Sequence, residues 1–296
     1  MPKESFEQFV KRQKEKLERA EKIVEEVKEK WRKEFEKFEM VGEKSVEELK
    51  RLWEENEGEA RKRVTLSEIF SFFLSLSLPE VPSFLLEKIS NKFLKEFDWK
   101  KFWERQYIDT DLGFFLSVFL RKNIENYISS QKQKGIKEEN IKPIEVHLKE
   151  LPVSLEGLGY RNPQKLHLTV EGNLGGGSGI EMEGGEIIVK GNCGVDTGGG
   201  MKGGKIVVEG NCENFTGRGM KGGEIVVKGN CGSYTGSGME GGVLILEGEV
   251  ESFDKFAFSP DNKGTIIWKN TKIWENGNWT KEGREMWEKG EIPVKG

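Results

Sequence analysis

The cysteines are the first residues whose type and spacing invite a chemical interpretation. Cys193, Cys212 and Cys231 are the three cysteines of the chain, and they recur every 19 residues. Thiolates ligate zinc and iron–sulfur clusters, but those centres need ligands that converge, whereas one thiol per repeat forms a line. The equivalent positions one repeat before and after are Leu174 and Val250. We therefore interpret the column as buried thiols, kept reduced in the cytoplasm, with a metal or redox site as the alternative.

The histidines and aspartates offer little further chemistry. His147 and His167 are the two histidines, and neither has Cys, Asp or Glu around it at ligand spacing, so we expect outward-facing strand residues. Asp109 and Asp111 precede an apolar run. Paired carboxylates can do acid–base work, but Thr110-Asp111 before such a run favours a helix N-cap. We assign no catalytic, cofactor-binding or metal-ligating residue and expect no cofactor.

Glycine-rich runs at 175–177 and 198–200 could be mistaken for phosphate-binding loops. A nucleotide-binding loop joins one strand to the N-terminus of a helix, and it does so once. Here the glycines recur in every repeat and no helical pattern follows them. We interpret them as sharp corners, because glycine reaches positive φ without a steric cost.

The elements that position these residues are short strands at the same 19-residue interval. Apolar runs at 186–190, 205–209, 224–228 and 243–247 each follow a Gly-Gly pair. The charges that flank the runs alternate in sign. They are Glu171, Lys190, Glu209, Lys228 and Glu247 on one side, and Glu186, Lys205 and Glu224 on the other. In-register parallel neighbours lie about 4.8 Å apart, where like charges would repel, so the alternation favours a parallel β-helix of about six coils over 141–270.

The series extends at both ends. Residues 167–171 supply an early strand, and alternating apolar residues at 144–148 mark a strand that leads into the first coil. Residues 264–270 repeat the pattern after a three-residue insertion, and Lys269 is expected to continue the alternation after Glu247.

Side-chain alternation divides each strand into two faces. Ile187, Val189 and their equivalents are assigned to the interior. The intervening residues face outward and are also apolar: Ile188, Val207, Val226 and Ile245. An apolar strip between charged columns predicts a cover, either the helical half of the chain or a second copy.

One motif of the repeat resembles a known family. The pattern Gly198-x-Gly200-Met201-x-Gly203-Gly204-x-Ile206-x-Val208-x-Gly210 recurs from Gly217 to Gly229. It resembles the GXGXG domain, which forms the C-terminus of the large chain of glutamate synthase and one of the subunits of formylmethanofuran dehydrogenase, over about residues 160–270. The resemblance implies a right-handed parallel β-helix that packs against catalytic subunits of a redox complex, with no active-site residues to carry over.

The N-terminal part, over 1–63, is expected to be helical. Residues 3–41 carry apolar side chains at heptad spacing between charged faces, which predicts one long coiled-coil-like helix with a partner helix. Gly42 is expected to end it. Val46, Leu49, Leu52 and Trp53 begin a second amphipathic piece that stops near Gly58.

Residues 64–140 are rich in aromatic residues and predict a small helical bundle. Apolar runs at 69–74 and 112–120 are too short to cross a membrane, and a stripe at 99–107 contains Trp99, Phe102, Trp103 and Tyr107. We interpret them as buried, with a membrane-surface or subunit-binding patch as the alternative. A polar linker over 135–143 follows. Residues 271–296 form the C-terminal part, where Asn276-Gly277 between tryptophans predicts a hairpin that caps the last coil.

Composition narrows the function. The net charge is −4 and 33% of residues are charged with both signs mixed, so no basic face suits nucleic acid. The abundance of Lys and Glu suggests a thermophile. The charged N-terminus argues against an export signal and favours the cytoplasm.

We expect an α+β chain that serves as a non-catalytic scaffold or accessory subunit of a redox assembly. It would form a homo-oligomer or bind other subunits through its N-terminal helices and outer β-helix face. The alternatives are a β-helix subunit that contributes directly to an oxidoreductase of the glutamate synthase or formylmethanofuran dehydrogenase type, and a self-assembling particle or membrane-surface tether.

Overall fold

The computed structural model describes residues 33, 36, 37, 40–56, 75–96, 110–149, 151 and 154–295, apart from the side chains of Phe84, Thr110 and Asp111. The chain divides into two compact units, Met1–Ser45 and Val46–Gly296. The described residues of the first unit are helical. The heptad seam predicted over 3–41 lies almost entirely outside the described residues.

Gly42 lies within a helical segment, so the prediction that it ends the N-terminal helix is wrong. A glycine that ends a helix takes positive φ, and Gly42 does not. In the same segment, the Ser45 hydroxyl donates to the Val41 carbonyl at 2.8 Å. A single glycine weakens a helix by about 1 kcal/mol relative to alanine but does not stop it.

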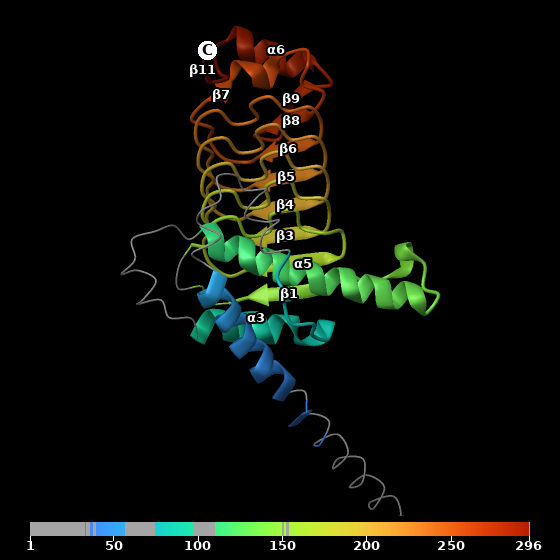
Figure 1. The fold of residues 1–296 in the computed structure, drawn as a ribbon. Coiled ribbons are helices and arrows are strands. Elements are labelled where there is room, and N and C mark those ends of the chain that lie inside the picture. The colour runs from blue at the N-terminus through green and yellow to red at the C-terminus, as the bar shows by residue number, and fades with distance from the viewer. Residues whose placement is uncertain are drawn as a thin grey trace, which may run out of the picture. The chain divides into compact units, whose positions relative to one another are not determined.

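Seven parallel strands form the body of the second unit, stacked as successive rungs of a solenoid (Figure 1). They are β1 (Ile144–Leu148), β2 (Leu166–Val170), β3 (Glu186–Val189), β4 (Lys205–Val208), β5 (Glu224–Val227), β6 (Val243–Leu246) and β8 (Thr265–Trp268). Equivalent residues pair in register, as Ile187 does with Ile206 and Ile206 with Ile225. The parallel β-solenoid of about six turns is thus confirmed. β1 pairs with β2 along its whole length, so the predicted leading strand is itself a rung.

The core of the solenoid consists of columns of equivalent side chains. Ile187, Val189 and their equivalents in β4, β5 and β6 are at most 1% exposed, as predicted. Met182, Met201, Met220 and Met239 form a second buried column. The residues between the inward ones are half-buried: Ile188, Val207, Val226 and Ile245.

The corners of the coils require residues in the left-handed region of φ. In one coil these residues are Asp196, Gly198 and Gly200, with φ of 60°, 68° and 61°. The next coil repeats them 19 residues on, as Phe215, Gly217 and Gly219. Because strands and not helices follow, the glycine-rich runs are corners and not phosphate-binding loops.

Helices cover the β1 end of the solenoid. Residues 46–56 are helical, as predicted, and Val46, Leu49, Leu52 and Trp53 are buried. The other helices are η1 (Ser83–Leu85), α3 (Leu86–Glu96), α5 (Thr110–Gln133) and η2 (Glu138–Asn140). The ring of Phe115 in α5 lies 5.6 Å from that of Trp53 and 6.0 Å from that of Phe93. The aromatic run at 69–74 and the stripe at 99–107 lie outside the described residues.

The chain ends with short elements on the last rung (Figure 1). They are β7 (Phe253–Asp254), η3 (Lys255–Phe258), β9 (Thr271–Glu275), β10 (Asn278–Trp279), α6 (Lys281–Glu288) and β11 (Val294–Lys295). β9 runs antiparallel to β8 and to β10, and β11 pairs with β7. Asn276 and Gly277 join β9 to β10 with φ of 46° and 81°. In the part of the chain that the structure describes, no helix has the length and hydropathy needed to cross a bilayer.

Candidate functional site: two closed ends and an outward face

The outer edge of β1 is hydrogen-bonded by side chains of α3. The Asn91 amide donates to the His147 carbonyl at 2.6 Å and accepts from the Lys149 N–H at 2.8 Å. The Glu87 carboxylate accepts from the His147 N–H at 3.2 Å. An exposed edge strand pairs readily with another chain. These bonds occupy the outer edge of β1 at His147 and Lys149, so a further strand cannot pair there.

α5 closes the adjacent corner of the first coil. The Ser117 hydroxyl accepts from the Gly159 N–H at 2.9 Å and donates to the Gly113 carbonyl at 2.7 Å. Arg121 donates to the Arg161 carbonyl at 2.8 Å. A Cβ at Gly113 would overlap the Glu156 carbonyl, so glycine allows this close approach.

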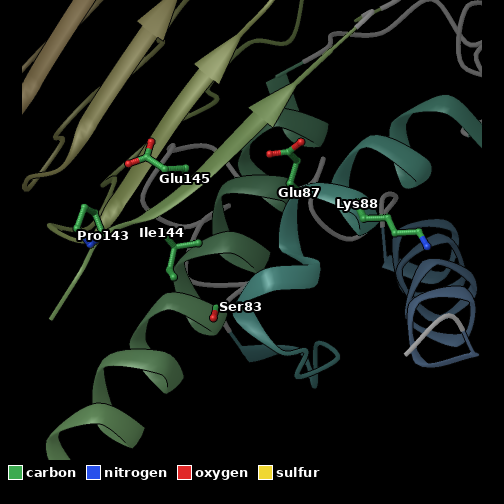
Figure 2. Close-up of a pocket in the computed structure, with 6 residues that line it drawn as sticks. All are labelled: Ser83, Glu87, Lys88, Pro143, Ile144 and Glu145. Carbon is green, nitrogen blue, oxygen red and sulfur yellow. The ribbon is translucent and has the colours of Figure 1, made fainter. Parts of the chain in front are cut away.

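A hollow of about 590 Å³ lies beside the α3–β1 junction (Figure 2). Figure 2 shows Ser83, Glu87 and Lys88 on its helical side and Ile144 and Glu145 on the strand side. Pro143 completes the lining. Both carboxylates have partners, since Glu87 binds the β1 backbone and the Glu145 carboxylate lies 3.1 Å from Nδ1 of His167. Both carboxylates are therefore engaged in contacts within the chain and are not a free pair of acids.

The opposite end of the sheet is occupied by β9, β10 and α6. The Thr280 hydroxyl accepts from the Gly283 N–H at 3.0 Å as the N-cap of α6, and it also donates to the Lys272 carbonyl. Aromatic rings fill the space behind: Phe258 stacks on Trp279 at 4.3 Å, and Trp279 on Trp287 at 5.5 Å. Backbone and side-chain groups of the chain thus occupy the edge of the last parallel rung.

The cysteines stand in one buried column, as predicted. Cys193, Cys212 and Cys231 are free and 2–4% exposed, and they are in-register neighbours between Leu174 and Val250. Hydrogen bonding to Cys212 and burial raise the pKa of the Cys193 and Cys231 thiols. Across the described ranges, no three or more His, Cys, Asp or Glu side chains converge as metal ligands. This environment favours the neutral form of Cys193 and Cys231, and all three thiols are packed in the column.

An asparagine ladder runs beside the thiols, and we did not predict it from the sequence. The side-chain oxygens of Asn173, Asn192, Asn211 and Asn230 each accept the backbone N–H of the equivalent residue in the next coil, at 2.7–2.9 Å. The last donor is Glu249. The sequence signal for this ladder is the Asn that recurs every 19 residues in the Gly-Asn-Cys triplets.

The charged columns form ion pairs between neighbouring coils, but not at every step. Lys190 lies 3.1 Å from Glu171, and Lys228 lies 3.3 Å from Glu209. Lys269, which continues the alternation in sign after Glu247, pairs with Glu249 at 2.6 Å. Lys269 is in the β8–β9 turn, with φ of 49°.

Two of the corner positions carry charged residues in place of glycine. Arg161 and Glu181 have φ of 50° and 51°, and the Arg161 guanidinium donates twice to the Glu181 carboxylate at 2.9–3.0 Å. Lys202 donates to the same carboxylate at 3.3 Å. Burial raises the pKa of Glu181, but the bonds and charges of Arg161 and Lys202 outweigh it, and the pKa is lowered.

The other predicted residues do not form a site. His147 and His167 are half-buried strand residues, as expected. Asp109 and the side chains of Thr110 and Asp111 lie outside the described residues, so the predicted cap does too; the backbone of α5 begins at Thr110. Comparisons of the chain with models of protein families, with curated proteins and with solved structures return no match.

Proposed function

We propose that this protein is a non-catalytic scaffold or accessory subunit of a cytoplasmic redox assembly, and that it binds other subunits through the outward face of its solenoid and its N-terminal helices. One observation carries the proposal. Both edges of the parallel sheet are occupied by the chain's own groups, at Asn91 and Glu87 on β1 and at β9 on β8. The outward face stays open for recognition, with its half-buried apolar strip between charged columns.

Several finer features belong to the same proposal. The solenoid winds to the right, as the resemblance to the GXGXG family implies. The hairpin at Asn276-Gly277, with Trp274 and Trp279, caps the last coil and keeps it from pairing with a neighbour. The seam at 3–41 forms a coiled coil with a partner helix. In this arrangement the solenoid is a rigid spacer, and chemistry belongs to the partner subunits.

Purification of the native protein from its source cells tests this function. We expect it to elute well above the mass of one chain, together with flavin, molybdopterin or iron–sulfur subunits identified by mass spectrometry. A tagged chain expressed alone is the control, and it should carry no such cofactor. A native protein that elutes as a single chain without partners would contradict the proposal.

A further inference from the structure

The outward face of the sheet carries three residues per strand. At β3, β4 and β5 the first and last are charged and the middle one is apolar. They are Glu186, Ile188 and Lys190 at β3, Lys205, Val207 and Glu209 at β4, and Glu224, Val226 and Lys228 at β5. The lysine side chains are 46–48% exposed, so the charges reach solvent on both sides of the apolar strip.

The signs of these charges alternate in two directions. Along the solenoid they alternate from strand to strand, which places Lys205 2.7 Å from Glu224. Across the strip they are opposite at the two ends of each strand, as at Lys205 and Glu209. Stacking of coils requires only the first alternation, because residues at opposite ends of a strand belong to different columns. The second alternation remains to be explained.

The second alternation matches the symmetry of a face-to-face dimer. A two-fold axis parallel to the solenoid sets each strand opposite the same strand of the other copy with its ends exchanged. Glu186 then faces Lys190 of the second copy, Lys205 faces Glu209, and Glu224 faces Lys228. Like charges do not meet at these three strands, and the apolar strips lie against each other.

We propose that a second copy of this chain binds on the outward face of β2–β6, with the two solenoids parallel and related by this axis. The inference rests on the proposed function, since it names one partner of the face assigned there to docking. The spacing between strands and the rise per residue along each strand give the outward-facing residues of β2–β6, here called the array, an area of about 16 by 24 Å, or about 400 Å² per copy. A typical stable interface buries about 800 Å² per partner, so we expect a reversible dimer.

Sedimentation equilibrium of the full chain, from nanomolar to millimolar concentration, tests the dimer. K205E places a new carboxylate opposite Glu209 of the second copy, twice per dimer, and should weaken dimerisation about tenfold or more. K205E/E209K restores opposite charges across the interface and should recover dimerisation. Within one chain the double variant is worse than the single one, because it creates like-charge neighbours in both columns. Recovery therefore separates a dimer contact from an effect on folding.

Two further variants test the apolar strip. V207E places two carboxylates near the symmetry axis and should abolish the dimer. V195E is the matched control, because Val195 is 43% exposed on a corner of the solenoid and outside the array. Circular dichroism must show that each variant remains folded.

Three results would overturn the proposed parallel dimer: a wild-type chain that is monomeric at every concentration, a V207E variant that dimerises like the wild type, or a K205E/E209K variant no better than K205E. The last result would point to a two-fold axis along the strands between β4 and β5, which sets Lys205 opposite Glu224. Other subunits found with a single copy of this chain would also refute the dimer but leave the proposed function intact.

Discussion

Among single residues, the asparagine of each coil has the clearest structural role. Its side-chain oxygen accepts a backbone N–H from the next coil, so a side chain supplies a hydrogen bond between two neighbouring coils of the stack. The cysteine that follows fills a buried slot, whereas the asparagine itself is exposed. The more exposed of these two residues therefore has the clearer role in hydrogen bonding between coils.

We expect Asn211→Ala to lower the free energy of unfolding by about 1 kcal/mol, because the Asn230 N–H loses its acceptor. Urea denaturation measures the change, with Asn140→Ala at an exposed position of η2 as the control. An equal effect at the two sites would show that the ladder contributes nothing particular.

The ion pair at Glu181 predicts a defined pH dependence. Its folded pKa lies below its ordinary value of 4.5, so the unfolded chain binds the proton more tightly. The stability that the ionised carboxylate contributes is therefore present above pH 4.5 and is lost as the pH falls through the lowered value.

Glu181→Gln should cost about 1 kcal/mol at neutral pH, and the difference from the wild type should shrink as the pH falls below that range. Thermal melts at a series of pH values measure it, with the exposed Glu54→Gln as the control. A difference that grows towards low pH would contradict the sign of the shift.

At the scale of elements, α3 covers the outer edge of β1, where a preceding coil of the solenoid would otherwise stack. One turn of helix separates Glu87 from Asn91, and this spacing directs both side chains at the backbone of His147 and Lys149. The helix thereby ends the stack without contributing a strand. This arrangement explains how a solenoid of parallel strands avoids pairing with a neighbour at this edge.

We expect Asn91→Leu to lower the free energy of unfolding by about 2–3 kcal/mol, since it leaves the His147 carbonyl and the Lys149 N–H without partners. Asn56→Leu is a matched control, because both amides donate to the carbonyl four residues earlier but Asn56 makes no bond to a strand. Hydrogen exchange at the Lys149 amide should accelerate in the first variant alone. Equal exchange rates in the two variants would show that α3 does not close the edge.

At the scale of the whole molecule, the repeat made the solenoid predictable, because equivalent residues in every coil make the same contacts. Strand register, inward faces and the thiol column follow from one 19-residue period. The closed ends could not be found in this way, since Asn91, Ser117 and Arg121 each occur once and make contacts far along the chain. Gly42 misled for a different reason: glycine commonly ends helices, but here the backbone continues as a helix.

Cross-linking of the native assembly, with carboxylate-to-lysine chemistry and mass spectrometry, tests most directly whether this protein makes its contacts through the outward face. We predict that Lys190, Lys205 and Lys228 are joined to a second copy or to other subunits. Cross-links between chains that involve only the β8 end of the solenoid, such as Lys272, would contradict the account.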